Sequence, residues 1–254
     1  MAHTVSRHMA GEAQRRERPF LTSQWLDLVM LNYEIEPELL WDHVPEGTEL
    51  DSFHGKTYLS LVGFRFCRTK LFGKIAVPFH GEFAEVNLRF CVRREVQGEL
   101  RRGVVFIAEI VPKRLIAATA RFIYGENYFR LPMRYTVEQG GRRMAAEYSF
   151  QGKGNWCRFW AESESRAVLP CEDGFEQFIT EHYWGYSRQG NATLEYQVAH
   201  APWGVWPRAE GGFEGDATAL YGAELAKVLR RKPDSVLIAD GSEVAVYRGR
   251  RISR

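Results

Sequence analysis

Residues 83–93 alternate between two kinds of side chain with a period of two, and this pattern constrains the fold more than any other in the chain. Every second position is apolar: Ala84, Val86, Leu88, Phe90 and Val92. The positions between them include Glu85, Asn87, Arg89 and Arg93. Successive side chains of a β-strand point to opposite faces, so this stretch is predicted to be a strand with one apolar and one polar face. The polar face either lines an interior, where it needs partners or a polar ligand, or faces solvent on an open sheet.

Strand-like stretches follow one another along the chain without alternating with helices. Besides the stretch above, they are residues 21–35, 57–67, 104–111, 128–138, 143–151, 156–163 and 192–200. Helical spacing of apolar side chains is confined to residues 38–43, 115–125, 172–183 and 216–231. Consecutive strands are typical of the α+β class, so we predict a mainly antiparallel sheet, curled or barrel-like, with a few short helices.

Two glycine-containing dipeptides predict hairpin turns. Gly140-Gly141 separates residues 128–138 from residues 143–151. Asp240-Gly241 is predicted to join a terminal pair of strands, residues 235–239 and 243–248.

The chain has 254 residues, of which 45% are hydrophobic and 26% charged, a composition typical of a globular protein. We predict a polar tail at residues 1–18 and a single domain at residues 19–254. No apolar run approaches the roughly 18–20 residues that span a membrane, and the tail lacks the apolar core of a secretory signal. The four cysteines are too widely spaced for a disulfide framework. These features predict a cytoplasmic protein without a membrane partner, and they are compatible with a homo-oligomer.

The formal net charge of +2 hides an uneven distribution. Four arginines against two glutamates give the tail a net charge of +2, and eight cations against three acids give residues 227–254 a net charge of +5. The body between them therefore carries −5. Basic chain ends are usually solvated, so no nucleic-acid partner is predicted. In an acidic body, an inward-facing arginine is a local exception and the favoured anchor for an anionic ligand.

The common motifs of cofactor and catalytic sites are absent from the sequence. It contains neither of the glycine-rich phosphate loops GxGxxG and GxxxxGK[ST], nor the HExxH and GxSxG motifs. No two histidines of the predicted domain lie within four residues of each other. We therefore predict no cofactor and no metal ion.

Seven short segments, taken in order, carry a family resemblance. They are residues 50–55 (Leu-Asp-Ser-Phe-His-Gly), 85–89 (Glu-Val-Asn-Leu-Arg), 102–106 (Arg-Gly-Val-Val-Phe), 120–121 (Ala-Arg), 131–133 (Leu-Pro-Met), 178–183 (Phe-Ile-Thr-Glu-His-Tyr) and 200–203 (His-Ala-Pro-Trp). Their order and spacing resemble the YqjF-like family of uncharacterised bacterial proteins, also called DUF2071, over residues 18–209. That family is similar in fold to acetoacetate decarboxylase, so the resemblance implies an antiparallel barrel- or cone-like sheet around a central pocket.

The resemblance also implies that the imine chemistry of the decarboxylase is lost. In that enzyme a Gly-Arg-Glu turn precedes an aromatic-Pro-Lys-Lys segment whose first lysine forms a Schiff base. By order along the chain, Ala120-Arg121 corresponds to the Gly-Arg pair, and Met133 and Arg134 correspond to the two lysines. A thioether cannot form an imine, and a guanidinium cannot replace the amine. Glu85 corresponds to a pocket-facing glutamate of the decarboxylase.

The function predicted on these grounds is the binding of a small polar or acidic organic molecule in the central pocket. The predicted ligand-binding residues are Glu85, Asn87, Arg89, Arg121, Tyr128, Arg134 and His182. A carboxylate is the group that an arginine such as Arg121 can bind with two parallel hydrogen bonds. Arg121 can equally form an ion pair with Glu109 or Glu126 within the protein.

Two other functions stay open at this stage. One is a decarboxylase-like enzyme that uses Lys113, because Val-Pro-Lys-Arg at residues 111–114 also places a lysine beside a cation. The plainer interpretation of Lys113 is a solvated residue in the first turn of a helix. The other function is that of a non-enzymatic interaction protein, with an aromatic and basic surface near the C-terminus. Its aromatic residues, which can otherwise pack at a sheet edge or line the pocket, are Tyr183, Trp184, Tyr186, Trp203 and Trp206.

Overall fold

Most of the described chain is β-strand. The computed structural model describes residues 18–73, 75–76, 82–112 and 127–252. Twelve of the described strands form a large sheet: β1 (Leu21–Ile35), β2 (Glu49–Leu50), β3 (Thr57–Leu71), β4 (Ile75–Ala76), β5 (Glu82–Val96), β6 (Glu99–Val111), β7 (Tyr128–Arg130), β11 (Trp184–Gln189), β12 (Ala192–His200), β13 (Val205–Trp206), β15 (Ser235–Val246) and β16 (Arg250–Ile252). Four form a smaller sheet: β8 (Met133–Gly140), β9 (Arg143–Gln151), β10 (Trp156–Ser163) and β14 (Glu210–Glu214). The described helices are a 3₁₀ helix (Pro37–His43), α3 (Phe175–Thr180) and α4 (Thr218–Leu229).

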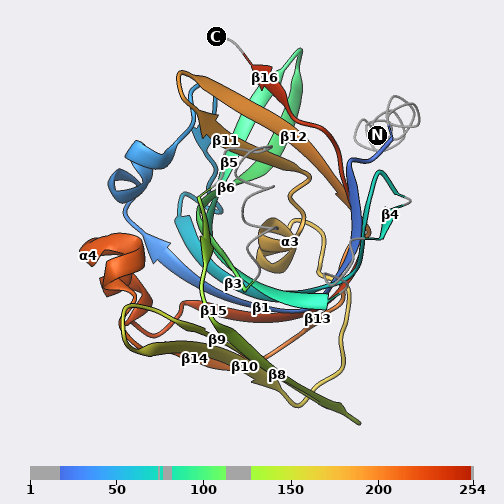
Figure 1. Ribbon diagram of the computed structural model, residues 1–254, viewed down its shortest axis with the longest axis vertical. Helices are drawn as coiled ribbons and strands as arrows, with labels where there is room; N and C mark the ends of the chain where they lie inside the picture. Colours follow the sequence, from blue (N-terminus) through green and yellow to red (C-terminus); the bar gives the residue numbers. More distant parts are fainter. Residues whose placement is uncertain (1–17, 74, 77–81, 113–126, 253–254) are drawn as a thin grey trace.

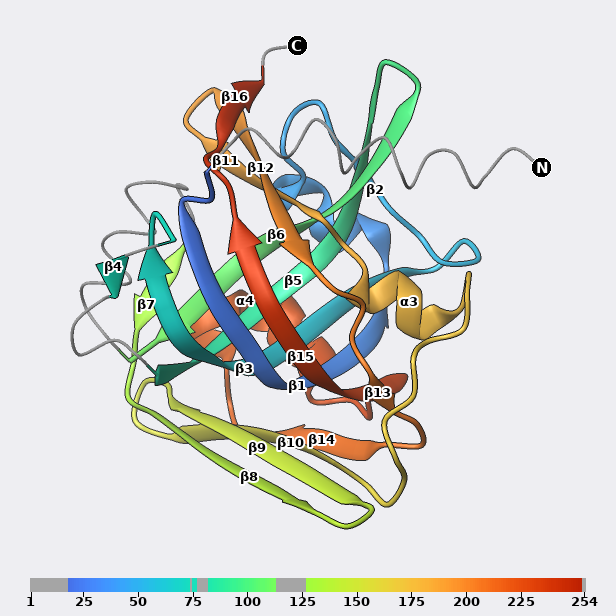
Figure 2. The ribbon, with the colours of Figure 1, turned by 90° about the vertical axis from the view of Figure 1, so that its right-hand side faces the viewer.

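The large sheet curls on itself. Its strands follow the order β13-β15-β1-β3-β5-β6-β11-β12-β16, and β12 pairs in addition with β15, which brings the two ends of this order together. The strands curve round a common interior, and α3 lies across one end of the curl (Figures 1 and 2). Strand β6 runs parallel to β7 and to β11, so the sheet is mixed and not purely antiparallel. The predicted architecture of mostly strands with few helices is confirmed at this level.

The alternation in residues 83–93 corresponds to β5, which pairs with β3 on one side and β6 on the other. The predicted strand at residues 128–138 is in fact two strands, β7 and β8, that belong to different sheets. Pro132 lies between them and lacks the N–H group that a continuous ladder requires. Strand β11 was missed, because its second residue, Gly185, is typical of a break in a strand pattern.

The predicted terminal hairpin over Asp240-Gly241 is wrong. Residues Ser235–Val246 form one continuous strand, β15, which pairs with β1 from end to end. A Cβ atom on Gly241 would stand 1.8 Å from the carbonyl oxygen of Trp25. Gly241, with φ of 82°, therefore allows β15 to approach β1 closely and does not form a turn. The hairpin over Gly140-Gly141 is confirmed by the pairing of β8 with β9.

Helix α4 confirms the helix predicted at residues 216–231, and α3 is shorter than the predicted 172–183. The helix predicted at residues 115–125 lies outside the described residues. The predicted tail also lies outside them, apart from Arg18.

The apolar face of β5 belongs to the core between the two sheets. Its five members are all buried there: Ala84, Val86, Leu88, Phe90 and Val92. The smaller sheet contributes Tyr148 and Phe159 to the same core. In Figure 2 the smaller sheet lies beneath the large one. A Cβ atom on Gly63 of β3 would stand 2.6 Å from the ring of Phe159 and 2.7 Å from that of Tyr148, so the missing side chain lets the two sheets come together.

A bulge in β1 joins the sheets by polar contacts. Asp27 has φ of 56°, and the register of β1 against β3 shifts at this point. The hydroxyl group of Tyr148 donates a hydrogen bond of 2.7 Å to the carbonyl oxygen of Asp27. The carboxylate of Asp27 forms an ion pair with Arg65, whose guanidinium also pairs with Glu82 at 2.5 Å. The bulge therefore ties the main chain of the large sheet to a side chain of the smaller one.

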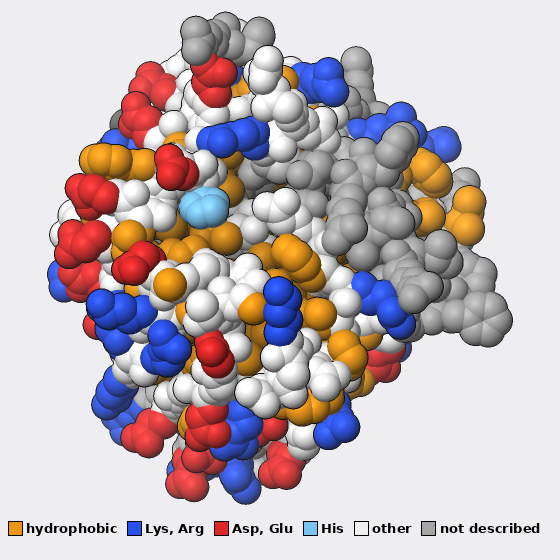
Figure 3. Space-filling view, turned by 60° about the vertical axis from the view of Figure 1, so that its left-hand side comes forward, with side chains coloured by type: hydrophobic (Ala, Val, Ile, Leu, Met, Phe, Trp, Pro, Cys, Tyr) orange, Lys and Arg blue, Asp and Glu red, His pale blue; other side chains and the backbone are white. Residues whose placement is uncertain are grey.

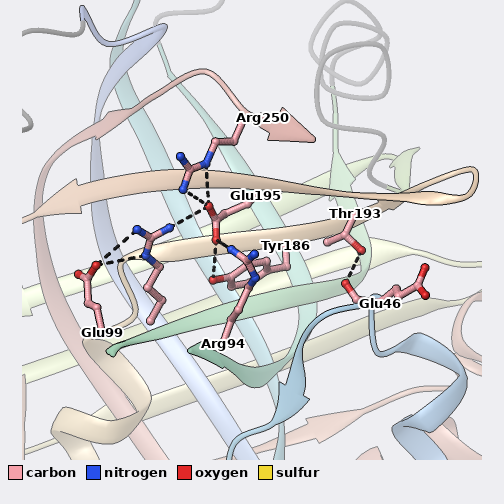
Figure 4. Close-up of polar contacts among 8 residues, drawn as sticks. Glu46, Arg94, Glu99, Tyr186, Thr193, Glu195 and Arg250 are labelled. Atoms are coloured by element: carbon pink, nitrogen blue, oxygen red, sulfur yellow. Dashed lines mark hydrogen bonds and ion pairs between the residues drawn. The ribbon is translucent and has the colours of Figure 1, made fainter. Parts of the chain in front are cut away.

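A buried carboxylate fastens the C-terminal strand (Figure 4). Glu195 on β12 accepts hydrogen bonds from Arg94 at 2.9 Å, Arg101 at 3.0 Å and Arg250 at 2.7 Å, and from the hydroxyl of Tyr186 at 3.3 Å. Burial alone raises the pKa of Glu195, but the three guanidinium groups outweigh it and hold that pKa below its ordinary value. Arg250 begins β16, so this cluster holds the last described strand against β12.

We predict that Gly63→Ala lowers the free energy of unfolding by roughly 1–3 kcal/mol, the usual cost of overpacking a core. The added methyl group would enter the rings of Phe159 and Tyr148. Urea denaturation measures the effect. Gly140→Ala is the matched control, because nothing lies within 4 Å of its Cβ position, and it should change stability by less than about 0.5 kcal/mol. Equal stability of the two variants would contradict the close approach at Gly63.

Candidate functional site

A cavity of about 180 Å³ lies inside the curl of the large sheet. Its wall is mostly apolar and comes from β1, β3, β5, β6, β12 and the segment around α3. The polar face of β5 lines this cavity and does not face solvent, since Glu85 is only 3% exposed and Asn87 only 2%. The sequence left open whether this face lines an interior or faces solvent, and the structure shows that it lines an interior.

Polar side chains form a row across three neighbouring strands at the cavity wall. Asn87 of β5 lies opposite Glu109 of β6, and Glu109 lies opposite Tyr128 of β7. The amide of Asn87 donates to Oε1 of Glu85 at 3.3 Å, and the hydroxyl of Tyr128 donates to Oε2 of the same carboxylate at 3.4 Å. Two buried carboxylates, an amide and a phenol therefore share one part of the wall.

Arg89 supplies a positive charge at the other side of Asn87. Its guanidinium donates to the carbonyl oxygen of Ile179 at 3.2 Å, near the C-terminal end of α3, and lies 3.9 Å from the sulfur of Met30. No carboxylate oxygen of the described residues lies within 4.0 Å of its nitrogens. Burial lowers the pKa of Arg89 below its ordinary value, yet a guanidinium stays protonated in proteins. Arg89 is the only lysine or arginine among the described residues of the wall.

His182 is a buried imidazole beside that charge. Burial lowers the pKa of His182 to about 3, and the positive charges of Arg89 and Arg102 act in the same direction. The ring is therefore neutral at ordinary pH and offers one donor and one acceptor. Neither ring nitrogen has a hydrogen-bond partner among the described residues, and the same holds for Oδ1 of Asn87 and Nε1 of Trp25. Buried polar atoms of this kind are usually satisfied by water or a ligand.

Five of the predicted ligand-binding residues line the cavity: Glu85, Asn87, Arg89, Tyr128 and His182. Arg134 does not lie there. It is exposed on β8 in the smaller sheet, where its guanidinium lies 4.3 Å from the ring centre of Trp156. The order of residues along the chain suggested a pocket position, but Pro132 separates β7 from β8 and the chain leaves the large sheet between them.

Met133 likewise packs against the core between the sheets and not against the cavity. From this stretch of chain it is Tyr128 that reaches the cavity wall. Lys113 and Arg121 lie outside the described residues. None of the described residues of the wall is a lysine.

Glu109 is a wall residue that the sequence suggested only as an ion-pair partner of Arg121. Its signal is that it is the single charged residue in the otherwise apolar residues 104–111. Trp184 and Trp203 also line the cavity, whereas Tyr186 and Trp206 are buried in the core between the sheets. The aromatic residues near the C-terminus are therefore mostly interior, which removes support for an aromatic interaction surface there.

A groove of about 720 Å³ adjoins the cavity at the surface. Trp184, Val198 and His200 belong to the lining of both, so these residues stand between solvent and the interior. The ring of His200 stacks on Trp203 with 4.3 Å between the ring centres. A ligand that enters from the groove would pass these side chains.

The outer surface carries charges of both signs. On the face in Figure 3 they are interspersed, with hydrophobic side chains between them. Across the described ranges, no three His, Cys, Asp or Glu side chains group closely enough to hold a metal ion. No helix within the same ranges has the length and apolar character needed to cross a membrane.

Comparison with solved structures identifies the class of fold. The chain matches acetoacetate decarboxylase from Legionella pneumophila with a TM-score of 0.67 and 15% identity, over 92% of this chain and 87% of that one. It also matches the enduracididine biosynthesis enzyme MppR complexed with pyruvate, with a TM-score of 0.61 and 14% identity, over 96% and 94% of the two chains. The fold is thus that of the acetoacetate decarboxylase-like proteins.

The particular family follows from the sequence comparison. The chain belongs to the DUF2071 family, described as an uncharacterized conserved protein, whose model matches residues 22–243. It is 23% identical over 182 residues to the uncharacterized protein YqjF of Bacillus subtilis (strain 168), covering 70% of this chain and 72% of that protein. The family resemblance read from the sequence is confirmed.

The low pKa of His182 predicts a pH dependence of stability. An unfolded histidine binds a proton below about pH 6.5, whereas the folded one stays neutral to about pH 3. Protonation therefore favours the unfolded chain, and the free energy of unfolding falls as the pH drops from about 6.5 towards 3. Lowering the pH from 7 to 5 should therefore reduce the free energy of unfolding by about 2 kcal/mol through His182 alone, at 1.36 kcal/mol per pKa unit.

Urea denaturation of the wild-type protein and of His182→Gln at both pH values measures this effect. The other titrating groups are common to both proteins, so the variant should lose less stability between pH 7 and pH 5 than the wild type. An identical loss in both would show that His182 titrates normally.

Proposed function

We propose that the protein binds a small acidic organic molecule in the central cavity, with the acid group on Arg89. The observation that carries this proposal is a partly buried guanidinium on the cavity wall with no carboxylate partner among the described residues. A guanidinium has five N–H donors, and one carbonyl oxygen and one thioether leave most of them unused. A carboxylate is the acceptor that matches such a fork.

The neighbourhood of Arg89 supports an anion over a neutral ligand. His182 is neutral, so it adds a donor without a competing charge. The carbonyl oxygen of Ile179 in α3 accepts one hydrogen bond from Arg89, and the remaining N–H groups of the guanidinium stay available for an anion. Two of the structural relatives carry small acids in their names, as acetoacetate decarboxylase and as MppR complexed with pyruvate. A cytoplasmic location and self-association stay predictions.

Isothermal titration calorimetry with acetate, pyruvate, butyrate and benzoate tests the proposal. The wild-type protein should bind at least one of them, and Arg89→Met should weaken that binding at least tenfold, since hydrogen bonds to a charged group contribute about 1.5–3 kcal/mol. Arg89→Lys keeps the positive charge but loses the paired N–H donors of the guanidinium. Its affinity should therefore lie between those of the wild type and Arg89→Met. Arg134→Met is the matched control and should bind like the wild type, because Arg134 lies on the other sheet. Absence of binding by every acid, or unchanged binding by Arg89→Met, would overturn the proposal.

The decarboxylase-like alternative is tested by reduction of a trapped imine. The proposed binding forms no covalent bond, so incubation with pyruvate or acetoacetate and borohydride should leave the mass of the protein unchanged. Intact-protein mass spectrometry reads the result. A covalent adduct that maps to Lys113 would show imine formation at that residue and favour the decarboxylase-like alternative.

A further inference from the structure

Strand β8 forms an outer edge of the smaller sheet (Figures 1 and 2). It pairs with β9 on one side, and no described strand pairs with its other side. Proteins usually protect such an edge with proline, lysine, a bulge or a very short strand. Residues Met133–Gly140 include no proline and no lysine, and their register against β9 is continuous. An edge of this kind is a template on which another strand can pair.

The odd-numbered residues of β8 direct their main-chain groups away from β9. The N–H group of Gln151 donates to the carbonyl oxygen of Pro132 at 3.0 Å, one step before the pair of Met133 and Phe150. Hydrogen-bonded and non-hydrogen-bonded pairs alternate along an antiparallel ladder. Even-numbered residues therefore bond to β9, and odd-numbered residues present N–H and C=O groups at the outer edge. These are Met133, Tyr135, Val137 and Gln139.

The two charged residues of β8 determine which strand suits this edge. Arg134 and Glu138 have opposite signs and are both exposed. Within one copy Glu138 lies 3.7 Å from Arg143, but its side chain is still 63% exposed, and a carboxylate can accept from more than one donor. A strand that carries the same two charges in the reverse direction is therefore matched to β8, and other charged strands are not.

A second copy of β8, running antiparallel, provides that match. When a twofold axis passes through Thr136, odd-numbered residues lie opposite odd-numbered residues, so the outer main-chain groups meet. Arg134 then lies opposite Glu138 of the second copy. Tyr135 lies opposite Val137, and the two copies of Thr136 face each other. Opposite charges, an aromatic ring beside a β-branched residue, and two threonines are all stabilising cross-strand pairs.

We infer that the protein forms a dimer in which the β8 strands of two copies pair antiparallel about a twofold axis at Thr136. Only this axis pairs the charges, because moving it by one residue in either direction places Arg134 opposite Thr136 or Gly140 instead. The smaller sheets of the two copies thereby join into one continuous sheet. No residue of β8 lines the central cavity, so the dimer and the proposed ligand binding are tested separately.

Analytical ultracentrifugation of the full chain over about a hundredfold range of concentration tests the inference. The wild-type protein should change from monomer to dimer as its concentration rises. Arg134→Glu and Glu138→Arg each put like charges at both contacts of the dimer, so each should weaken it at least about tenfold. Lys232→Glu is the matched control, because it makes the same charge change at an exposed residue between α4 and β15, and it should dimerise like the wild type.

An equimolar mixture of Arg134→Glu and Glu138→Arg tests the register itself. In a mixed dimer both contacts again join opposite charges, so the mixture should form the dimer that neither variant forms alone. A wild-type protein that stays monomeric at every concentration would overturn the inference. A dimer that both charge reversals leave intact, or a mixture that stays monomeric, would overturn it as well.

Val137→Pro tests the main-chain pairing. Because the N–H group of Val137 points to the outer edge, proline leaves the ladder with β9 complete and removes only a donor to the second copy. The dimer should weaken at least about tenfold, whereas Val137→Ala keeps the N–H group and should stay within about threefold of the wild type. Circular dichroism checks that both variants are folded. Equal dimerisation of the two folded variants would contradict pairing through β8.

Discussion

The burial of both faces of β5 is the constraint on which the rest of the structure depends. Its apolar face is sealed by the smaller sheet and α4, and its other face lies inside the curl of the large sheet. A row that contains Glu85, Asn87 and Arg89 is costly to remove from water unless each group has a partner. The hydroxyl of Tyr128 on β7 and the carbonyl of Ile179 in α3 meet part of that need. The hydrogen-bonding groups of Asn87 and Arg89 that have no partner among the described residues define the candidate site.

Three features make this arrangement possible, and none of them lies on β5. Gly63 allows the smaller sheet to approach the large one, and the bulge at Asp27 fastens it by a hydrogen bond from Tyr148. The pairing of β12 with β15 completes the curl around the interior. Close to that edge, the buried Glu195 gathers three arginines and holds β16 in place. The cavity is therefore a product of the packing of the sheets, and the chemistry of its wall is a product of the strand register.

Much of the candidate site could be read from the sequence because it follows a local rule. The period of two in residues 83–93 predicted which side chains share a face, and Glu85, Asn87 and Arg89 do line the cavity together. The positions of Met133 and Arg134 could not be obtained in this way. Order along the chain placed them in the pocket, but the strand pattern does not show that the chain crosses to another sheet after Pro132. The hairpin predicted over Asp240-Gly241 was wrong for a related reason. The sequence cannot distinguish a glycine that allows two strands to approach closely from a glycine that forms a turn.

The sequence by itself determined the class of fold, the family and the two-faced character of β5, because these depend on periodicity and on ordered motifs that any stretch of chain carries with it. Only the tertiary structure decided that the polar face looks inward, that Glu109 joins it, and that Arg89 faces the cavity without a carboxylate partner among the described residues. Those facts depend on contacts between residues such as Arg89 and Ile179, which lie far apart in the chain. The physical reason is that a side chain's burial and partners are set by whichever strands pack around it, and alternation along one strand cannot specify them.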